Sequence, residues 1–331
     1  NYTGVTKRIM NCCEVLTARM PGGLAQVNIL LSTLMGGLSG SSLADAAMQC
    51  KMLVPTMESK GYSKSFSTVI TAASGMVVPL IPPGVGLIIY GCINNISIGK
   101  LFIAGIGPGI VLCVTLMIFT HFLSKKRGYL PSRTTKIPVS EKIAAVRPAF
   151  LPLLLPIIII GGVRIGVFTA SEAGTVAIVY AVLLGLLYKE LTLKNVMQGC
   201  KETVTTTASI MLIVAAATCF SWILTKEQIP QQFSQWMISN IHNKYVFLIM
   251  VNIFLLIVGM FIEGNASMIV LAPLLHPVAM AYGIDDIHFA MVYIFNCTIG
   301  AFTPPMGTLM FVSCGITKCP TKDFIKEAVP F

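Results

Sequence analysis

The feature that most constrains the fold is an internal repeat at an offset of 222 residues. At that offset the chain aligns with itself without a gap, and residues that interrupt helices coincide. The coinciding positions include Gly37 with Gly259, Ala44 with Ala266, Pro55 with Pro277, Gly61 with Gly283, and Pro82-Pro83 with Pro304-Pro305. Apolar residues would often match by chance, whereas prolines and glycines at breakpoints would not. The sequence therefore predicts two copies of one structural unit.

The composition places both copies in a membrane. Apolar residues make up 55% of the chain, charged residues only 11%, and the mean hydropathy is +0.82. Soluble domains carry about 25% charged residues, so we expect an integral membrane protein in contact with lipids. The net charge of +10 does not favour nucleic acid, because the basic residues gather in short loops between apolar segments. The ten cysteines show no metal-binding spacing and are interpreted as small buried apolar residues.

Each copy begins with a predicted helical hairpin that has a polar tip. The first hairpin has a half-helix from Leu24 to Met35, a tip from Gly36 to Asp45 and a returning half-helix that ends near Pro55. The second has a half-helix from Tyr245 to Gly259, a tip from Met260 to Asn265 and a returning half-helix that ends near Pro277. Open backbone at membrane depth is tolerated only inside protein or beside a cavity. Each tip is therefore expected to be re-entrant and to belong to a binding site.

Each copy continues with an uncharged run that is too long for one straight membrane span. The runs lie between Lys64 and Lys100 and between Asp286 and Lys318, whereas about 20 residues would suffice. Pro82-Pro83-Gly84 and Pro304-Pro305 interrupt them, because proline lacks an N–H and clashes with the preceding turn. The sequence thus predicts two interrupted helices, and four broken elements that meet at one depth.

The charges orient the two copies oppositely. Basic residues flank the first hairpin, which places its open end in the cytoplasm: Lys7, Arg8, Arg19, Lys51, Lys60 and Lys64. The second hairpin is flanked mainly by acidic residues and histidines, namely His276, Asp285, Asp286 and His288, and its one basic exception is Lys244. Its open end is therefore expected on the other side of the membrane. The predicted fold is an all-α integral membrane protein with inverted repeats, two re-entrant hairpins and two interrupted helices.

The repeat also divides the chain. We expect an interfacial arm helix at 1–20, a first transport repeat at 21–100, scaffold helices with a cytoplasmic loop at 101–225, a second arm helix at 226–244, a second transport repeat at 245–317, and the start of a final helix at 318–331. The predicted scaffold spans are Leu101 to Leu123, Pro148 to Val163, Ala173 to Tyr188 and Thr203 to Thr225. The repeat partners of the spans that begin at 148 and 203 would begin before residue 1, and the partner of Leu101 to Leu123 would run from 323 to 345, so a longer natural protein is expected at both ends.

The tips carry the residues expected to do chemistry. Ser39, Ser41, Ser42 and Asp45 in one copy correspond to a second polar group, Glu263, Gly264, Asn265 and Ser267. Hydroxyl, amide and unwound carbonyl oxygens are ligands for a hard cation such as sodium. The N-terminus of a returning half-helix offers free N–H groups to an anion. The pattern indicates ion-coupled transport of an acid, with sodium as the only metal and no cofactor.

Individual polar residues allow more than one interpretation. Asp45 is either a cation ligand or an N-cap, and Asn265 either coordinates or caps. Glu263 ends an uncharged run of 18 residues, where an acid is costly, so a functional role is favoured. Thr303 and Gly307 flank the second break and are expected to contribute backbone oxygens. Glu172 is expected to be structural, because an acid suits a helix start.

Other function classes fit less well. A channel would need a continuous polar pore, but the polar residues concentrate at the breaks. An intramembrane hydrolase would need H-E-x-x-H or two aspartates in spans, and the sequence has neither. The chain is therefore expected not to be an enzyme. A self-sufficient sodium/anion symporter of the divalent-anion type would share the hairpins and inverted repeats, and stays open as the alternative.

The motif Gly37-Leu38-Ser39-Gly40-Ser41-Ser42-Leu43-Ala44-Asp45-Ala46, with Pro79-Leu80-Ile81-Pro82-Pro83 and Thr303-Pro304-Pro305-Met306-Gly307, resembles the large membrane subunit of tripartite ATP-independent periplasmic (TRAP) transporters. The resemblance implies a sodium-driven elevator importer in a bacterial inner membrane. It also implies two partners, a small membrane subunit, separate or fused upstream, and a soluble periplasmic substrate-binding protein. The family carries C4-dicarboxylates, sialic acid or other organic acids, and within it this chain resembles the sialic-acid carriers.

The resemblance also assigns site residues. One sodium site is implied at the first tip and first break: Gly37, Ser39, Ser41, Pro82 and Gly84. A second is implied at the other tip and break: Gly259, Glu263, Asn265, Thr303 and Gly307. The substrate is expected between them, at Ser39, Ser41, Gly84 and Glu263. Many family members have Ser where Gly84 stands and Asp where Glu263 stands.

Overall fold

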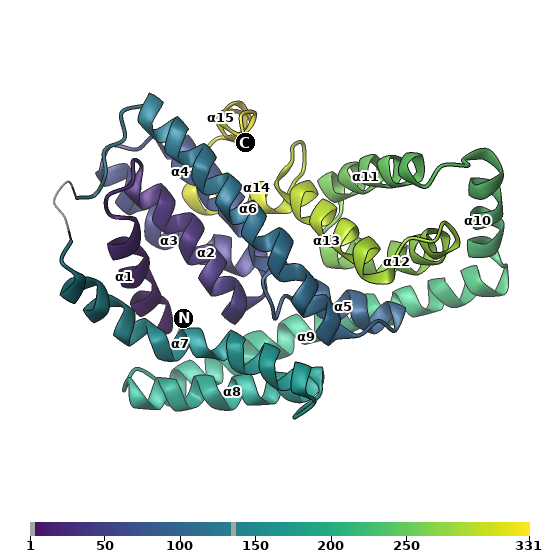
Figure 1. The fold of residues 1–331 in the computed structure, drawn as a ribbon, viewed down its shortest axis with the longest axis horizontal. Coiled ribbons are helices and arrows are strands. Elements are labelled where there is room, and N and C mark those ends of the chain that lie inside the picture. Colours follow the sequence, from purple (N-terminus) through teal and green to yellow (C-terminus); the bar gives the residue numbers. More distant parts are fainter. Residues whose placement is uncertain (1–3, 134–136) are drawn as a thin grey trace.

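A computed structural model describes residues 4–133 and 137–331. Within these residues every regular element is helical (Figure 1). The elements are α1 (Val5–Thr17), α2 (Gly23–Ser39), α3 (Ser42–Ser59), α4 (Lys64–Gly75), the 3-10 helix η1 (Val78–Leu80), α5 (Val85–Asn94), α6 (Ile98–Lys126), α7 (Val139–Ile165), α8 (Ala170–Leu187), α9 (Leu193–Lys226), α10 (Ile229–Asn240), α11 (Lys244–Phe261), α12 (Gly264–Ala281), α13 (Asp286–Phe302), α14 (Thr308–Thr317) and α15 (Thr321–Ala328).

The helix boundaries reproduce the sequence repeat. Adding 222 to the bounds of α3, residues 42 and 59, gives 264 and 281, which are the bounds of α12. Each copy runs arm helix, hairpin and broken helix, so α1 to α5 correspond to α10 to α14. Equivalent helices also begin with equivalent N-caps. The Ser63 side chain caps α4, and the Asp285 side chain, 222 residues later, caps α13.

The two copies interlock through their broken helices. Helix α5 of the first copy packs on α12 of the second, and α14 of the second packs on α3 and α4 of the first. One hydrophobic cluster accordingly joins Tyr90 to Phe247 and Tyr293. Another joins Phe66 to Leu309. This exchange places both hairpin tips and both breaks in the middle of the molecule.

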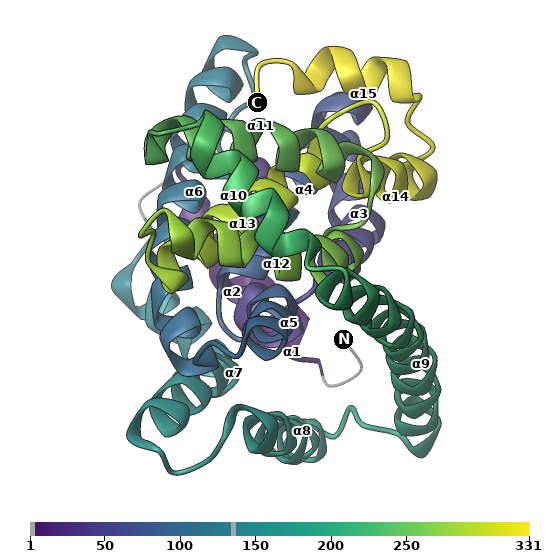
Figure 2. The ribbon, with the colours of Figure 1, turned by 90° about the vertical axis from the view of Figure 1, so that its right-hand side faces the viewer.

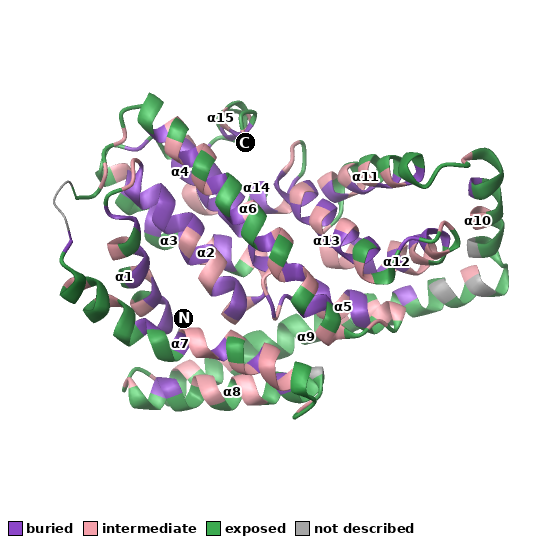
Figure 3. Cartoon of the chain, in the orientation of Figure 1, coloured by how far each residue is buried: buried purple, intermediate pink, exposed green. Residues whose placement is uncertain are grey.

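The lengths and surfaces of the helices are those of a helical membrane protein. Five helices in the described part of the chain are long and apolar enough to cross a membrane: Ile98–Lys126, Val139–Ile165, Leu193–Leu224, Lys244–Phe261 and Gly264–Ala281. Lys64–Leu80 and Val85–Asn94, bent by 41°, make a sixth candidate as one broken span. Large apolar side chains are exposed along α6 to α9 and α11. Figure 3 shows many exposed residues on these helices, and α9 runs along the outside of the body (Figure 2).

Two scaffold helices start earlier than predicted. Helix α7 begins at Val139 instead of Pro148, and α9 begins at Leu193 instead of Thr203. Hydropathy marks only the apolar part of each helix. Polar residues with good helix propensity, such as Glu141, Lys142 and Gln198, continue the same helices beyond the apolar part.

Candidate binding site

The first hairpin tip is a two-residue break, which is much shorter than the ten-residue tip that the sequence predicted. Helix α2 continues through Gly36 and Gly37 to Ser39, and α3 begins at Ser42. Gly40 ends α2 with a φ of 61°, and its N–H donates to the Gly36 carbonyl oxygen over 3.1 Å, a conformation that favours glycine. The Ser41 hydroxyl caps α3 by accepting from the Ala44 N–H at 3.4 Å.

The second tip is equally short and is organised by Glu263. Helix α11 ends at Phe261 and α12 begins at Gly264. One Glu263 carboxylate oxygen accepts from the Ala266 N–H at 3.0 Å, so this residue is the N-cap of α12. The other accepts from the Asn265 amide at 2.9 Å. Asn265 therefore supports Glu263 and does not cap the helix.

The two breaks lie against the tips. The Val85 N–H, where α5 begins, donates to the Gly40 carbonyl oxygen at 3.1 Å and ties the first break to the first tip. A Cβ at Gly84 would lie 2.1 Å from the Pro79 carbonyl oxygen, so a side chain there would require the backbone of this break to shift. In the second break a Cβ at Gly307 would lie 2.5 Å from the Ala301 carbonyl oxygen. Pro82-Pro83 and Pro304-Pro305 are both cis peptide bonds.

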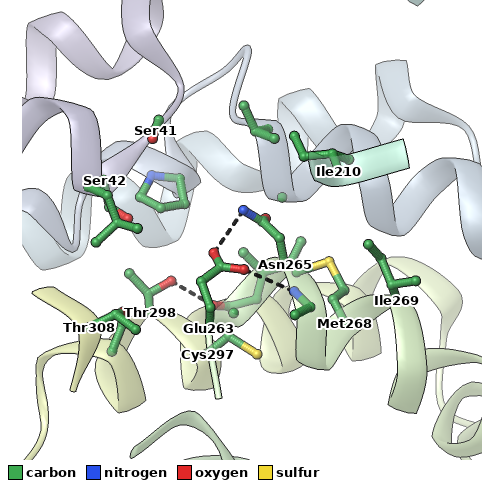
Figure 4. A pocket seen from close by; sticks show the side chains of 18 of the residues that line it. Ser41, Ser42, Ile210, Glu263, Asn265, Met268, Ile269, Cys297, Thr298 and Thr308 are labelled. Atoms are coloured by element: carbon green, nitrogen blue, oxygen red, sulfur yellow. Dashed lines mark hydrogen bonds between the residues drawn. The ribbon is translucent and has the colours of Figure 1, made fainter. Parts of the chain in front are cut away.

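A cavity of about 290 Å³ lies between the tips (Figure 4). Four helices begin at its wall, and their first residues line it: Ser42 of α3, Val85 of α5, Gly264 of α12 and Thr308 of α14. A helix N-terminus carries roughly half a positive charge. Some of its N–H groups are already paired here, since Ala44, Val85 and Ala266 donate to the Ser41 hydroxyl, the Gly40 carbonyl and the Glu263 carboxylate. The arrangement suits an anion at the starts of α3, α5 and α14, which no carboxylate caps.

The cavity brings some predicted site residues together and leaves others behind its wall. Ser41, Glu263 and Asn265 line it. The remaining predicted residues do not: Gly37, Ser39, Pro82, Gly84, Gly259, Thr303 and Gly307. The buried Ser39 hydroxyl has no hydrogen-bond partner within residues 4–133 and 137–331. Gly259 packs on Gly300, where an added Cβ would lie 3.0 Å from the Gly300 Cα.

Sequence reasoning missed the lining that α9 and α13 contribute. Thr206 and Ser209 of α9 and Cys297 and Thr298 of α13 also line the cavity. The signal available for α9 was a group of hydroxyl residues, Thr205 to Thr207 and Ser209, near the start of the apolar part of the helix. Sequence alone does not show which face of a long helix turns inward.

Two further expectations about acidic residues are resolved. Asp45 is not a cap, because the Ser41 hydroxyl occupies that position and Asp45 is buried among polar side chains. Glu172 is structural as predicted. Its carboxylate accepts from the Thr169 N–H at 2.7 Å in a capping box that starts α8.

Two helical repeats whose broken helices meet at one cavity within a multi-pass membrane protein have the architecture of the secondary-transporter class. Comparison with known proteins gives the family. Residues 1–331 match the model of the tripartite ATP-independent periplasmic transporter, DctM component, and the chain belongs to this family.

Relatives of known name share this assignment. The chain is 41% identical over 331 residues to the sialic acid TRAP transporter large permease protein SiaM of Vibrio cholerae, covering 100% of this chain and 77% of that protein. It is 36% identical to the sialic acid TRAP transporter permease protein SiaT of Haemophilus influenzae, covering 100% and 54%. It is also 36% identical to the C4-dicarboxylate TRAP transporter large permease protein DctM of Pseudomonas aeruginosa, covering 99% and 77%. These relatives are named as transporter permeases and not as enzymes.

Proposed function

We propose that the chain is the large membrane subunit of a TRAP transporter that imports an organic acid of the sialic-acid class across a bacterial inner membrane, driven by sodium. The observation that carries this proposal is the convergence of four helix N-termini on one cavity. A carboxylate bound there would accept hydrogen bonds from backbone N–H groups at no cost in side-chain ordering. The substrate class follows the relative from Vibrio cholerae.

The charge balance of the cavity supports sodium coupling. Glu263 contributes a carboxylate to the same cavity that would hold the acid. Two anions close together repel each other unless a cation lies nearby. Sodium ions at the two breaks would supply that charge, with oxygens from Ser39 and the Pro82 to Gly84 segment in one copy and from Thr303 to Gly307 in the other. Substrate and sodium would then each favour the binding of the other.

The fold supports an elevator movement. The hairpins and broken helices interlock into one packed unit, whereas α9 forms only one wall of the cavity. In the proposed mechanism the interlocked unit carries the bound acid across the membrane against a scaffold that includes α6 to α9. Both hairpins would be re-entrant, so that their tips meet at the same depth from opposite sides.

We also propose that two partners are needed, a small membrane subunit and a soluble periplasmic substrate-binding protein. The family description names a tripartite and periplasmic system. The isethionate TRAP transporter permease protein DctMQ of Oleidesulfovibrio alaskensis, 32% identical, is nearly twice as long as the matched segment, since the match covers 52% of it. A fused arrangement of the two membrane subunits is consistent with that length.

The test is uptake into vesicles that contain the chain in its natural full-length context together with the small subunit. Radiolabelled sialic acid is supplied with or without the binding protein, and with an inward sodium gradient or with potassium in its place. The proposal expects uptake only when both the binding protein and the sodium gradient are present. Sodium-dependent uptake without a binding protein would instead favour a self-sufficient symporter, and uptake indifferent to sodium would contradict ion coupling.

A further inference from the structure

A second polar group lies behind the first hairpin tip, away from the cavity. It is formed by six side chains from α2, α3 and α4, each no more than 1% exposed: Asn28, Ser32, Asp45, Gln49, Thr71 and Ser74. None of the six lines the cavity. We call them the Asp45 cluster, because Asp45 is its acidic member.

The hydrogen bonds of the Asp45 cluster form a chain that ends in unsatisfied acceptors. Asp45 Oδ2 accepts from Ser32 Oγ at 2.6 Å and from Gln49 Nε2 at 2.7 Å. Ser32 Oγ lies 3.0 Å from Ser74 Oγ. Asn28 connects Ser74 to Thr71: its Oδ1 accepts from Ser74 Oγ at 3.2 Å, and its Nδ2 donates to Thr71 Oγ1 at 2.6 Å. In the described part of the chain Asp45 Oδ1 and Gln49 Oε1 are buried without a partner.

The Asp45 carboxylate also lacks a compensating charge. It takes part in none of the ion pairs formed by residues 4–133 and 137–331. The helices α2 and α14 and the segment η1, which pack on α3, contain no Asp, Glu, Lys, Arg or His. The other titratable groups are Cys50, Glu58 and the exposed Lys51 on α3 itself, Cys314 on α14, and Lys64 on α4, which lies 3.7 Å from Glu58. A buried, unpaired carboxylate is strongly disfavoured.

The repeat shows that the fold does not require this cluster. At the 222-residue offset, Met250 and Phe254 stand where Asn28 and Ser32 are, and Leu271 stands where Gln49 is. Ser267 stands in place of Asp45. The second hairpin therefore forms the same helices without a buried acid, and the first copy carries a charge that needs a separate explanation.

We propose that the Asp45 cluster binds one monovalent positive charge, a sodium ion or a proton, behind the first hairpin tip. One carboxylate is neutralised by one such charge, whereas a divalent ion would leave an excess. The free oxygens of Asp45 and Gln49 are the acceptors that a proton or a sodium ion would occupy. This inference rests on the proposed ion-coupled transport. It adds to that transport one positive charge, bound by the Asp45 cluster, that would move together with the first hairpin.

The test replaces Asp45 with the residue that the second copy already tolerates. Asp45→Ser is compared with wild type and with Asp323→Asn, which removes an exposed carboxyl on α15 as a control. Two quantities are measured on the purified full-length protein: the number of radioactive sodium ions bound per chain at about pH 8, and the unfolding temperature from about pH 5 to pH 9 in potassium.

If the charge is sodium, Asp45→Ser binds one sodium fewer per chain than wild type. If it is a proton, sodium binding is equal, and the wild type loses stability as the pH rises because the buried carboxyl becomes charged. Asp45→Ser lacks that loss. The proposal is overturned if Asp45→Ser matches wild type in both measurements. If the wild-type protein binds no sodium, the proposed sodium coupling is contradicted. The dependence of the unfolding temperature on pH then remains as the test of this inference.

A second variant keeps the inference testable if Asp45→Ser does not fold. Gln49→Leu copies Leu271 of the second copy and retains the carboxylate while removing the neighbouring amide oxygen. Sodium affinity is then expected to fall roughly tenfold, in line with the loss of a supporting ligand, or the pH dependence of the unfolding temperature to become steeper. Unchanged sodium affinity together with an unchanged pH profile would contradict the proposal.

Discussion

Glu263 is the residue whose charge and position bear most on the proposed transport. Its two carboxylate oxygens are held by the Ala266 N–H and the Asn265 amide. Glu263→Gln keeps one oxygen to cap α12 but removes the charge. Hydrogen bonds to charged groups contribute about 1.5–3 kcal/mol, so we expect sodium-driven uptake to fall roughly tenfold or more while the protein still inserts. Uptake is measured against Glu172→Gln, which alters only the α8 capping box, and equal uptake in both variants would remove Glu263 from the site.

Ser41 combines a structural and a binding role at the first tip. Its hydroxyl caps α3 and lines the cavity. Ser41→Ala is expected to lower the free energy of unfolding by about 1 kcal/mol through the lost cap and to lose sodium-driven uptake. Ser41→Thr retains a capping hydroxyl and should recover most of the stability. If Ser41→Ala transports like wild type, Ser41 is a cap only.

At the residue scale, the sequence is a better guide to which polar side chains are important than to the role of each one. The cost of an acid after an uncharged run favoured a functional role for Glu263; the residue lines the cavity, and its role stays a prediction. The alternatives for Asp45 did not include the environment observed, since a linear pattern does not show that Asn28, Thr71 and Ser74 belong to the same buried hydrogen-bond network. Hydrogen-bond partners distant in sequence are set by packing.

At the scale of helices, the contact between α11 and α13 depends on two glycines. A Cβ at Gly300 would lie 2.7 Å from the Gly259 Cα, a backbone atom that has no room to move aside. Gly300→Ala is therefore expected to destabilise the protein by about 1–3 kcal/mol, measured as a lower unfolding temperature. Gly315→Ala is the control, because nothing lies within 4 Å of its added Cβ, and it should be neutral or slightly stabilising. Equal effects of the two variants would contradict this packing.

Helix α9 offers a test of whether the scaffold closes the substrate cavity. Ser209 lines the cavity, whereas Val204 on the same helix does not and is 68% exposed. Ser209→Phe adds a ring to a space of about 290 Å³ and is expected to reduce uptake severalfold, since small misplacements in a site are costly. Val204→Phe should transport like wild type. The idea fails if Ser209→Phe transports normally, or if both variants lose uptake to the same extent.

The positions of helix breaks were predictable because their causes are local. Pro82-Pro83 separates η1 from α5, Pro304-Pro305 separates α13 from α14, and the glycine-serine step at Gly40-Ser41 separates α2 from α3. The lengths of the tips were overestimated, since Gly36 and Gly37 stay helical where they pack closely on Val78 and Pro156. A glycine in a sequence shows that the backbone is free to bend, whereas packing decides whether it does.

At the scale of the whole molecule, the exchange of broken helices between the copies explains why the tips of both copies line the same cavity. Because α5 packs on α12 and α14 packs on α3, the helices that follow the two breaks reach that cavity together. The 222-residue repeat predicted that four breaks would meet, but not that the halves would interlock. The inverted orientation and the elevator movement remain predictions that follow from the charge pattern and the family.

The central claim is that an acid binds where the N-termini of α3, α5, α12 and α14 meet, with sodium beside it. The most direct test is the experimental structure of the full-length protein with its small subunit in lipid nanodiscs, determined with sodium and sialic acid. The account predicts substrate density in this cavity, with its carboxylate against the N-termini of these helices and both hairpin tips ending at mid-membrane. Substrate bound elsewhere, or α11 and α12 each crossing the whole bilayer, would contradict it.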